Sequence, residues 1–124
     1  NPKKWLKSRF NRSPEREFGS IEKEYLRSFK QTKRIYASCE DYRAAATIDL
    51  EHDKKDRNKK LNIPIQVLWG KKGVVGKQFN SVKIWKKYTT KKVYGAEINS
   101  EHFIPEESPK QTIKYLKNFF LRNV

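Results

Sequence analysis

The sequence predicts a protein of the α/β class, and two observations support this prediction. In residues 1–58, apolar side chains recur every three or four positions, which is the spacing of amphipathic helices. In residues 59–124, two short apolar runs, 63–70 and 93–99, alternate with helical patterns, as in a parallel sheet with its connecting helices. Two parallel strands cannot form a sheet that is buried on both faces, so we expect this chain to need more strands than it contains.

The first segment is predicted to consist of helices. A short helix and a connector occupy residues 1–19, and Ser20 is the predicted N-cap of the helix that follows. A longer helical run begins near residue 33, and its apolar positions are Ile35, Cys39, Tyr42, Ala46 and Leu50. This spacing predicts that Tyr42 lies on the buried face of its helix and that Cys39 is a small buried apolar side chain.

The second segment contains the two predicted strands. The run 63–70 is almost continuously apolar and ends in glycine, which is typical of a strand covered on both faces. The loop 70–76 follows this strand, and open α/β sheets place ligands at that edge. Asn80 is the predicted N-cap of the next helix, and residues 93–99 form the second strand.

The last helix has the clearest start signal in the chain. Ser108 and Gln111 have the spacing of a capping box, and Pro109 occupies the first helical position. Its predicted apolar face consists of Ile113, Leu116 and Phe120.

The composition is strongly basic, with 29 Lys and Arg against 14 Asp and Glu among 124 residues and a net charge of +15. The basic residues are mostly lysines, which occur as pairs in elements of different type. Arginine is the better residue for bidentate contacts to phosphates and bases. The pattern therefore favours a solvated lysine-rich surface over a nucleic-acid interface.

The sequence contains no obvious metal site, disulfide framework or targeting segment. Cys39 is the single cysteine, which fits a reducing compartment, and no apolar stretch has the length of a membrane span. His52 lies between Glu51 and Asp53, but neighbouring positions on a helix point apart. We expect a cytoplasmic protein that uses no metal ion and no cofactor. Because the sequence starts at Asn1 and has no methionine, we also expect it to be a piece of a longer product.

His102 is the most informative residue for function. It follows the second predicted strand and precedes the last helix, where several α/β enzymes hold their general base. Taken alone, it is also compatible with a histidine in a surface loop. No Gly-x-Asp-x-Gly or Gly-x-Ser-x-Gly segment, which would carry a nucleophile, occurs in the chain.

Several segments together resemble the C-terminal half of haloacetate dehalogenases, the fluoroacetate dehalogenase branch of the α/β-hydrolase fold. The segments are Cys-Glu-Asp-Tyr-Arg-Ala-Ala-Ala at 39–46, Asp-Leu-Glu-His-Asp at 49–53, Leu-Trp-Gly at 68–70 with Gly73 and Gly76, Trp85, and His-Phe-Ile-Pro-Glu-Glu-Ser-Pro at 102–109. They occur in the same order and with nearly the same spacing as in that family. The resemblance runs from about Tyr25 to the end of the chain.

The resemblance implies a two-step hydrolysis. An aspartate displaces the halide to form an ester, and a histidine activates the water that cleaves this ester. His102 matches that histidine, and Tyr42 matches the tyrosine that donates a hydrogen bond to the departing halide. The nucleophile and the arginines that bind the substrate carboxylate belong to the half that is absent here. Glu101 replaces the glycine that normally precedes the histidine, which puts the position of His102 in question.

We therefore expect the C-terminal part of an α/β-hydrolase fold, with cap-type helices in residues 1–58 and the last two parallel core strands with flanking helices in residues 59–124. A haloacetate would be the substrate of the complete enzyme, and the chain alone is predicted to be inactive. One alternative is a split or decayed non-catalytic module that forms a homo-oligomer or pairs with a separate N-terminal half. A second alternative is a basic protein that binds nucleic acid.

Overall fold

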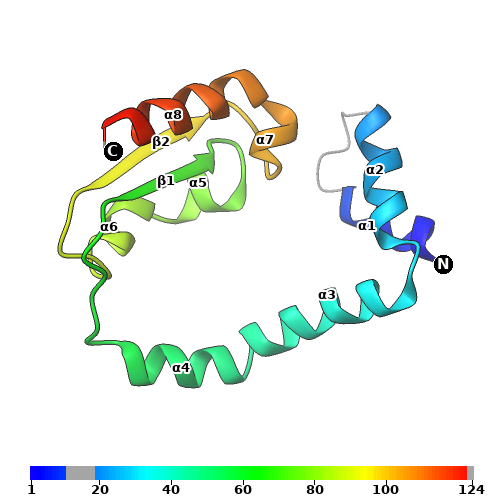
Figure 1. Cartoon of the computed structure of the whole chain (residues 1–124), viewed down its shortest axis with the longest axis horizontal. Coiled ribbons are helices and arrows are strands. Elements are labelled where there is room, and N and C mark those ends of the chain that lie inside the picture. Colours follow the sequence, from blue (N-terminus) through cyan, green and yellow to red (C-terminus); the bar gives the residue numbers. More distant parts are fainter. Residues whose placement is uncertain (11–18, 123–124) are drawn as a thin grey trace. The chain divides into compact units, whose positions relative to one another are not determined.

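The chain divides into two compact units. The structure is a computed structural model that describes residues 1–10 and 19–122. One unit is Asn1–Asn58 and the other is Lys59–Val124. The described part of the first unit is helical, and the second contains a parallel pair of strands with helices on both faces (Figure 1).

The described part of the first unit consists of four helices, of which the first two pack against each other. Its elements are α1 (Pro2–Phe10), α2 (Gly19–Phe29), α3 (Thr32–Ala45) and α4 (Ile48–Asp56). Trp5 of α1 packs against Phe29 of α2 with ring centroids 5.1 Å apart, and Leu6 beside it is 3% exposed. Helix α2 begins at Gly19, so Ser20 lies inside the helix and the predicted N-cap at Ser20 is wrong.

Helices α3 and α4 are more exposed than their apolar spacing predicts. Neither has a buried residue, and Tyr42 is 61% exposed, so its predicted burial is wrong. Cys39 is half-buried rather than buried. The predicted single helix is interrupted near Thr47, whose hydroxyl donates to the carbonyl of Arg43. Apolar spacing leads to burial only where a second element covers the apolar face, and within the described part of the first unit none covers this one.

The second unit is built on two parallel strands, β1 (Ile65–Gly70) and β2 (Val93–Ile98). Their register pairs Ile65 with Val93 and Gly70 with Ile98, so both strands end at the same edge. Helix α8 (Pro109–Arg122) lies against one face of the pair, and α5 (Val74–Gln78) and α6 (Ser81–Trp85) lie against the other (Figure 1). The short helix α7 (Ile104–Glu107) connects β2 to α8. The two strands were predicted to within two residues.

The core of this unit is small and centres on β2. Ile98 is fully buried and Val93 is nearly so. At Gly95, a Cβ atom would lie 2.2 Å from Cγ2 of Val82 and 3.1 Å from the ring of Trp69, so the absence of a side chain allows α6 to approach the strand. Strand β1 is half-buried except at Gly70. The prediction that β1 is covered on both faces is therefore wrong, because the helices beside a sheet of only two strands do not exclude water from both of its faces.

The connection between α5 and α6 follows the sequence prediction. The side chain of Asn80 accepts a hydrogen bond of 2.9 Å from the backbone N–H of Lys83, which confirms Asn80 as an N-cap. Helix α8 begins at Pro109, as predicted. Ser108 and Gln111 do not form the predicted capping box. Both side chains bond to the backbone that follows β2, because that segment runs beside the start of α8.

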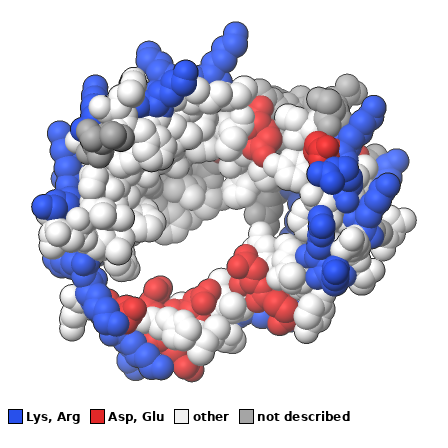
Figure 2. Space-filling model, in the orientation of Figure 1, with Lys and Arg blue, Asp and Glu red and all other residues white. Residues whose placement is uncertain are grey.

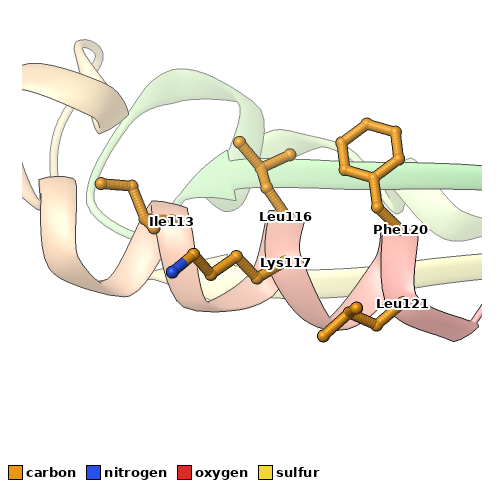
Figure 3. A pocket seen from close by; sticks show the side chains of 5 residues that line it. All are labelled: Ile113, Leu116, Lys117, Phe120 and Leu121. Atoms are coloured by element: carbon orange, nitrogen blue, oxygen red, sulfur yellow. The ribbon is translucent and has the colours of Figure 1, made fainter.

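Helix α8 packs on the sheet through a different face from the predicted one. Phe119 contacts Tyr94 of β2 with ring centroids 5.7 Å apart, and Thr112 is buried. The predicted face is instead open to solvent, with Ile113 52%, Leu116 38% and Phe120 59% exposed. Leu116 and Phe120 project from the same side of α8 and, with Lys117 and Leu121, line a shallow apolar groove (Figure 3). Helix α8 carries two adjacent apolar faces, and sequence spacing alone does not select between them.

The difference in burial between Ile98 and Ile113 predicts a large loss of stability for one substitution and almost none for the other. Ile98→Ala removes a fully buried side chain and is expected to cost about 2–5 kcal/mol of unfolding free energy. The same substitution at Ile113, which is 52% exposed, should change it by less than about 0.5 kcal/mol. Urea denaturation followed by circular dichroism measures both values. Equal losses for the two variants would contradict the assignment of the core to β2.

Candidate active site

His102 lies in the turn that joins β2 to α7, at the edge where both strands end. Its side chain is exposed, and its imidazole meets the ring of Phe103 edge to face with centroids 4.8 Å apart. A general base must reach a water molecule and a reacting group, which requires an accessible imidazole on a fixed backbone.

The carboxylate of Glu107 spans the backbone on both sides of His102. Its Oε2 accepts a hydrogen bond of 2.6 Å from the N–H of Glu101, and its Oε1 accepts one of 3.0 Å from the N–H of Phe103. Hydrogen bonds to an ionised acceptor are stronger than those between neutral groups. One side chain of α7 therefore fixes the peptide groups before and after the histidine.

The loop that leaves β1 packs directly on the backbone of Glu101. A Cβ atom at Gly70 would lie 1.7 Å from the Glu101 carbonyl oxygen, and one at Gly73 would lie 2.7 Å from the same oxygen. Only a residue without a side chain permits this approach. The two glycines of the Gly-containing loop thus allow the end of β1 to hold the segment that carries His102.

Backbone hydrogen bonds join the same two segments. The N–H of Lys71 donates to the carbonyl of Ile98 at 2.9 Å. The N–H of Lys72 donates to the carbonyl of Ser100 at 3.0 Å. These bonds continue the pairing of β1 and β2 past the ends of the strands and stop two residues before His102.

The start of α8 holds the other side of this segment. The N–H of Asn99 donates to Oε1 of Gln111 at 3.1 Å, and the hydroxyl of Ser108 donates to the carbonyl of Asn99 at 3.0 Å. The segment 98–103 is thereby tied to β1, α7 and α8 at once. A histidine in this segment has a well-defined backbone even though its side chain is exposed.

Tyr42, the second predicted site residue, lies on α3 in the first unit. The guanidinium carbon of Arg9 lies 6.0 Å from the centroid of its ring and 5.1 Å from that of Trp5. The structure thus places a cation beside the phenol that is predicted to bind a halide. Sequence reasoning missed Arg9, because nothing in the order of residues 1–45 predicts that α1 lies near the end of α3.

Charge is distributed unevenly over the molecule. Lysine and arginine side chains project from many elements, and acidic side chains gather over α3 and α4 (Figure 2). Among residues 1–10 and 19–122, no group of three or more metal-ligating side chains comes together. Within the same residues, no helix has the length and apolar character that crossing a bilayer requires.

Three known proteins are among those similar to this chain. The chain is 29% identical to a fluoroacetate dehalogenase from Burkholderia sp over 96 residues, which is 77% of this chain and 31% of the dehalogenase. The crystal structure of a candidate acyltransferase from Salmonella enterica matches all of this chain and 42% of its own, with a TM-score of 0.89 and 35% identity. That of a candidate α/β-hydrolase from Nostoc sp PCC 7120 matches 97% of this chain and 42% of its own, with a TM-score of 0.85 and 38% identity.

This chain is part of an α/β-hydrolase fold. The high TM-scores over nearly its whole length, together with the parallel strands and their helices, confirm the fold class predicted from the sequence. The similarity to a fluoroacetate dehalogenase confirms the resemblance noted in the segments 39–46 to 102–109. No family model matches the chain. This α/β-hydrolase portion spans less than half the length of each of the three relatives.

The contact between Gly70 and Glu101 predicts a sensitive position far from His102 in sequence. Gly70→Ala places a methyl group against the Glu101 carbonyl and is expected to cost roughly 1–3 kcal/mol of unfolding free energy. The backbone amide resonances of residues 101–103 should shift in the NMR spectrum of this variant. Lys72→Ala is the control, because its side chain is exposed and its backbone bond is kept. Unchanged resonances in Gly70→Ala would contradict the close packing.

Proposed function

We propose that this chain supplies the base-bearing part of a hydrolase that cleaves the carbon–halogen bond of haloacetates. The observation that carries the proposal is the position of His102, which follows β2 in a segment held by Gly70, Glu107 and α8. The similarity to a fluoroacetate dehalogenase supports the substrate class. An exposed imidazole on a firmly held backbone suits a base that must meet a water molecule and an ester.

The proposed reaction has two steps and needs residues of a complementary half. A carboxylate of that half attacks the α-carbon of the haloacetate, the carbon–halogen bond breaks, and the halide leaves with the electron pair. The Tyr42 hydroxyl donates a hydrogen bond to this halide, and the charge of Arg9 favours the anion. His102 then takes a proton from water, the resulting hydroxide attacks the ester carbonyl, and the hydroxy acid and the carboxylate are released.

The proposal requires that the chain alone be inactive. Its sequence contains no nucleophile elbow, and covalent catalysis stops at the first step when the nucleophile is missing. The single cysteine is compatible with a cytoplasmic location, which we include in the proposal.

We further propose that the exposed face of α8 is covered by the nucleophile-bearing half rather than by a second copy. The exposed face of α8, formed by Ile113, Leu116 and Phe120, supports association, because a monomer gains free energy by covering such a face. The same helix carries four basic residues and no acidic one. A second copy docked through this face would bring like charges together, whereas a different polypeptide can supply opposite charges.

A chimera tests the reaction. The part of the Burkholderia sp fluoroacetate dehalogenase outside the matched region is joined to this chain, and fluoride release from fluoroacetate is measured with a fluoride electrode. The chimera should release fluoride, and the 124-residue chain alone should not. His102→Ala should lower the rate of the chimera by about 100-fold or more, the usual contribution of a general base. Tyr42→Phe should lower it on the order of 10-fold, because it removes one hydrogen bond to a charged leaving group.

His52→Ala is the matched control for these variants, since His52 lies exposed on α4 and has no role in the proposed reaction. Its chimera should keep the rate of the unsubstituted one. Fluoride release by the isolated chain above the level of its own His102→Ala variant would overturn the proposal.

The proposed partner surface on α8 has its own test. Leu116→Asp and Phe120→Asp place charges in the apolar groove, and each should weaken binding to the separately produced remainder of the dehalogenase at least 10-fold. Isothermal titration calorimetry measures the affinity. Asn118→Asp, which adds the same charge at an exposed polar position of α8, should leave it nearly unchanged. A stable dimer of the chain alone that the two apolar variants dissociate would favour self-association instead.

A further inference from the structure

We infer that Glu107 is the positioning residue of His102 and that it acts through the backbone on both sides of the imidazole. The inference rests on the proposed function, because the position of His102 matters to catalysis only where His102 is the base. Glu107 belongs to a segment of the sequence that resembles the dehalogenases, but its role comes from contacts that the structure gives.

The carboxylate of Glu107 bonds to the peptide groups on both sides of His102. Its two oxygens accept from the N–H groups of Glu101 and Phe103, at 2.6 Å and 3.0 Å. The two oxygens share one rigid plane, so the two peptide groups are held at a fixed separation. His102 is the single residue between them, and its Cα position follows from theirs.

Glu107 also takes part in the start of α7. Phe103 is the N-cap residue of α7, and its side chain has no acceptor with which to cap the helix. Glu107 instead accepts from the N–H of Phe103 itself, while its own N–H donates to the Phe103 carbonyl at 2.8 Å. This reciprocal pair is similar to one half of a capping box.

The bond to Glu101 goes beyond what a helix start requires. Glu101 lies outside α7, and its carbonyl oxygen is already packed against Gly70 and Gly73. With its N–H bonded to Glu107, the Glu101 peptide is held from both sides. The half-buried carboxylate of Glu107 and the loop that follows β1 thus hold the residue before His102 together.

The chemistry predicts which step depends on Glu107. Formation of the ester needs the nucleophile and the halide donor, whereas its hydrolysis needs a base within hydrogen-bond reach of water. A misplacement of about 1 Å can lower the rate of such a step about 100-fold. Loss of Glu107 should therefore leave ester formation intact and slow ester hydrolysis.

Amide hydrogen exchange in the full 124-residue chain tests the positioning without any activity. In Glu107→Gln, the side-chain amide can accept at one of the two positions but not at both, so exchange at Glu101 or Phe103 should become at least about 10-fold faster. The amide of Lys71, which bonds to Ile98, should keep its protection and report that the fold is intact. Glu97→Gln is the matched control, because that carboxylate is exposed and pairs with Lys71. Unchanged exchange at both Glu101 and Phe103 would overturn the inference.

The chimera described above tests the consequence for catalysis. Glu107→Gln should lower kcat about 10- to 100-fold while intact-mass spectrometry shows the covalent ester accumulating, and Glu107→Asp should recover part of the rate because a carboxylate is restored. A variant that is merely unfolded would accumulate no ester. If His102→Ala accumulates ester but Glu107→Gln turns over normally, the inference about Glu107 fails and the proposed function stands. If His102→Ala turns over normally, the proposed function itself fails, and the exchange measurement still decides whether Glu107 holds the loop.

Discussion

The packing of Gly70 against the Glu101 peptide is the constraint on which the second unit depends. The register of β1 and β2 ends with Gly70 beside Ile98, and the absence of a side chain at Gly70 lets the two chain segments continue side by side. The bonds from Lys71 and Lys72 follow from that approach. The turn that carries His102, and with it the start of α7, takes its place from these contacts rather than from any contact of the imidazole.

Local signals predicted the elements of the second unit well. Apolar runs located both strands to within two residues, Asn80 was correctly predicted as an N-cap, and Pro109 marked the first residue of α8. These features depend on neighbours in sequence, such as a side-chain acceptor close to a helix start. A few neighbouring residues determine these features, so they can be predicted without the tertiary structure.

Burial was predicted poorly, because it depends on which element covers a face. Tyr42 has the spacing of a buried residue and is exposed, and the predicted apolar face of α8 with Phe120 is open to solvent. The site divides in the same way. His102 was predicted as a site residue from its place after a strand and from a resemblance. The hydrogen bonds of the Glu107 carboxylate and the position of Arg9 near Tyr42 could be learned only from the coordinates. A carboxylate four residues after an N-cap that has no acceptor is the one signal that could have indicated Glu107.

The second apolar face of α8 has a consequence for the life of the protein in a cell. A polypeptide that keeps such a face in water is captured by chaperones or removed by proteases more often than one whose apolar surface is covered. Its lifetime then depends on how quickly a cover is found after synthesis. The lifetime of this chain would therefore lengthen when Ile113, Leu116 and Phe120 are covered, whether by another part of the same protein or by a partner.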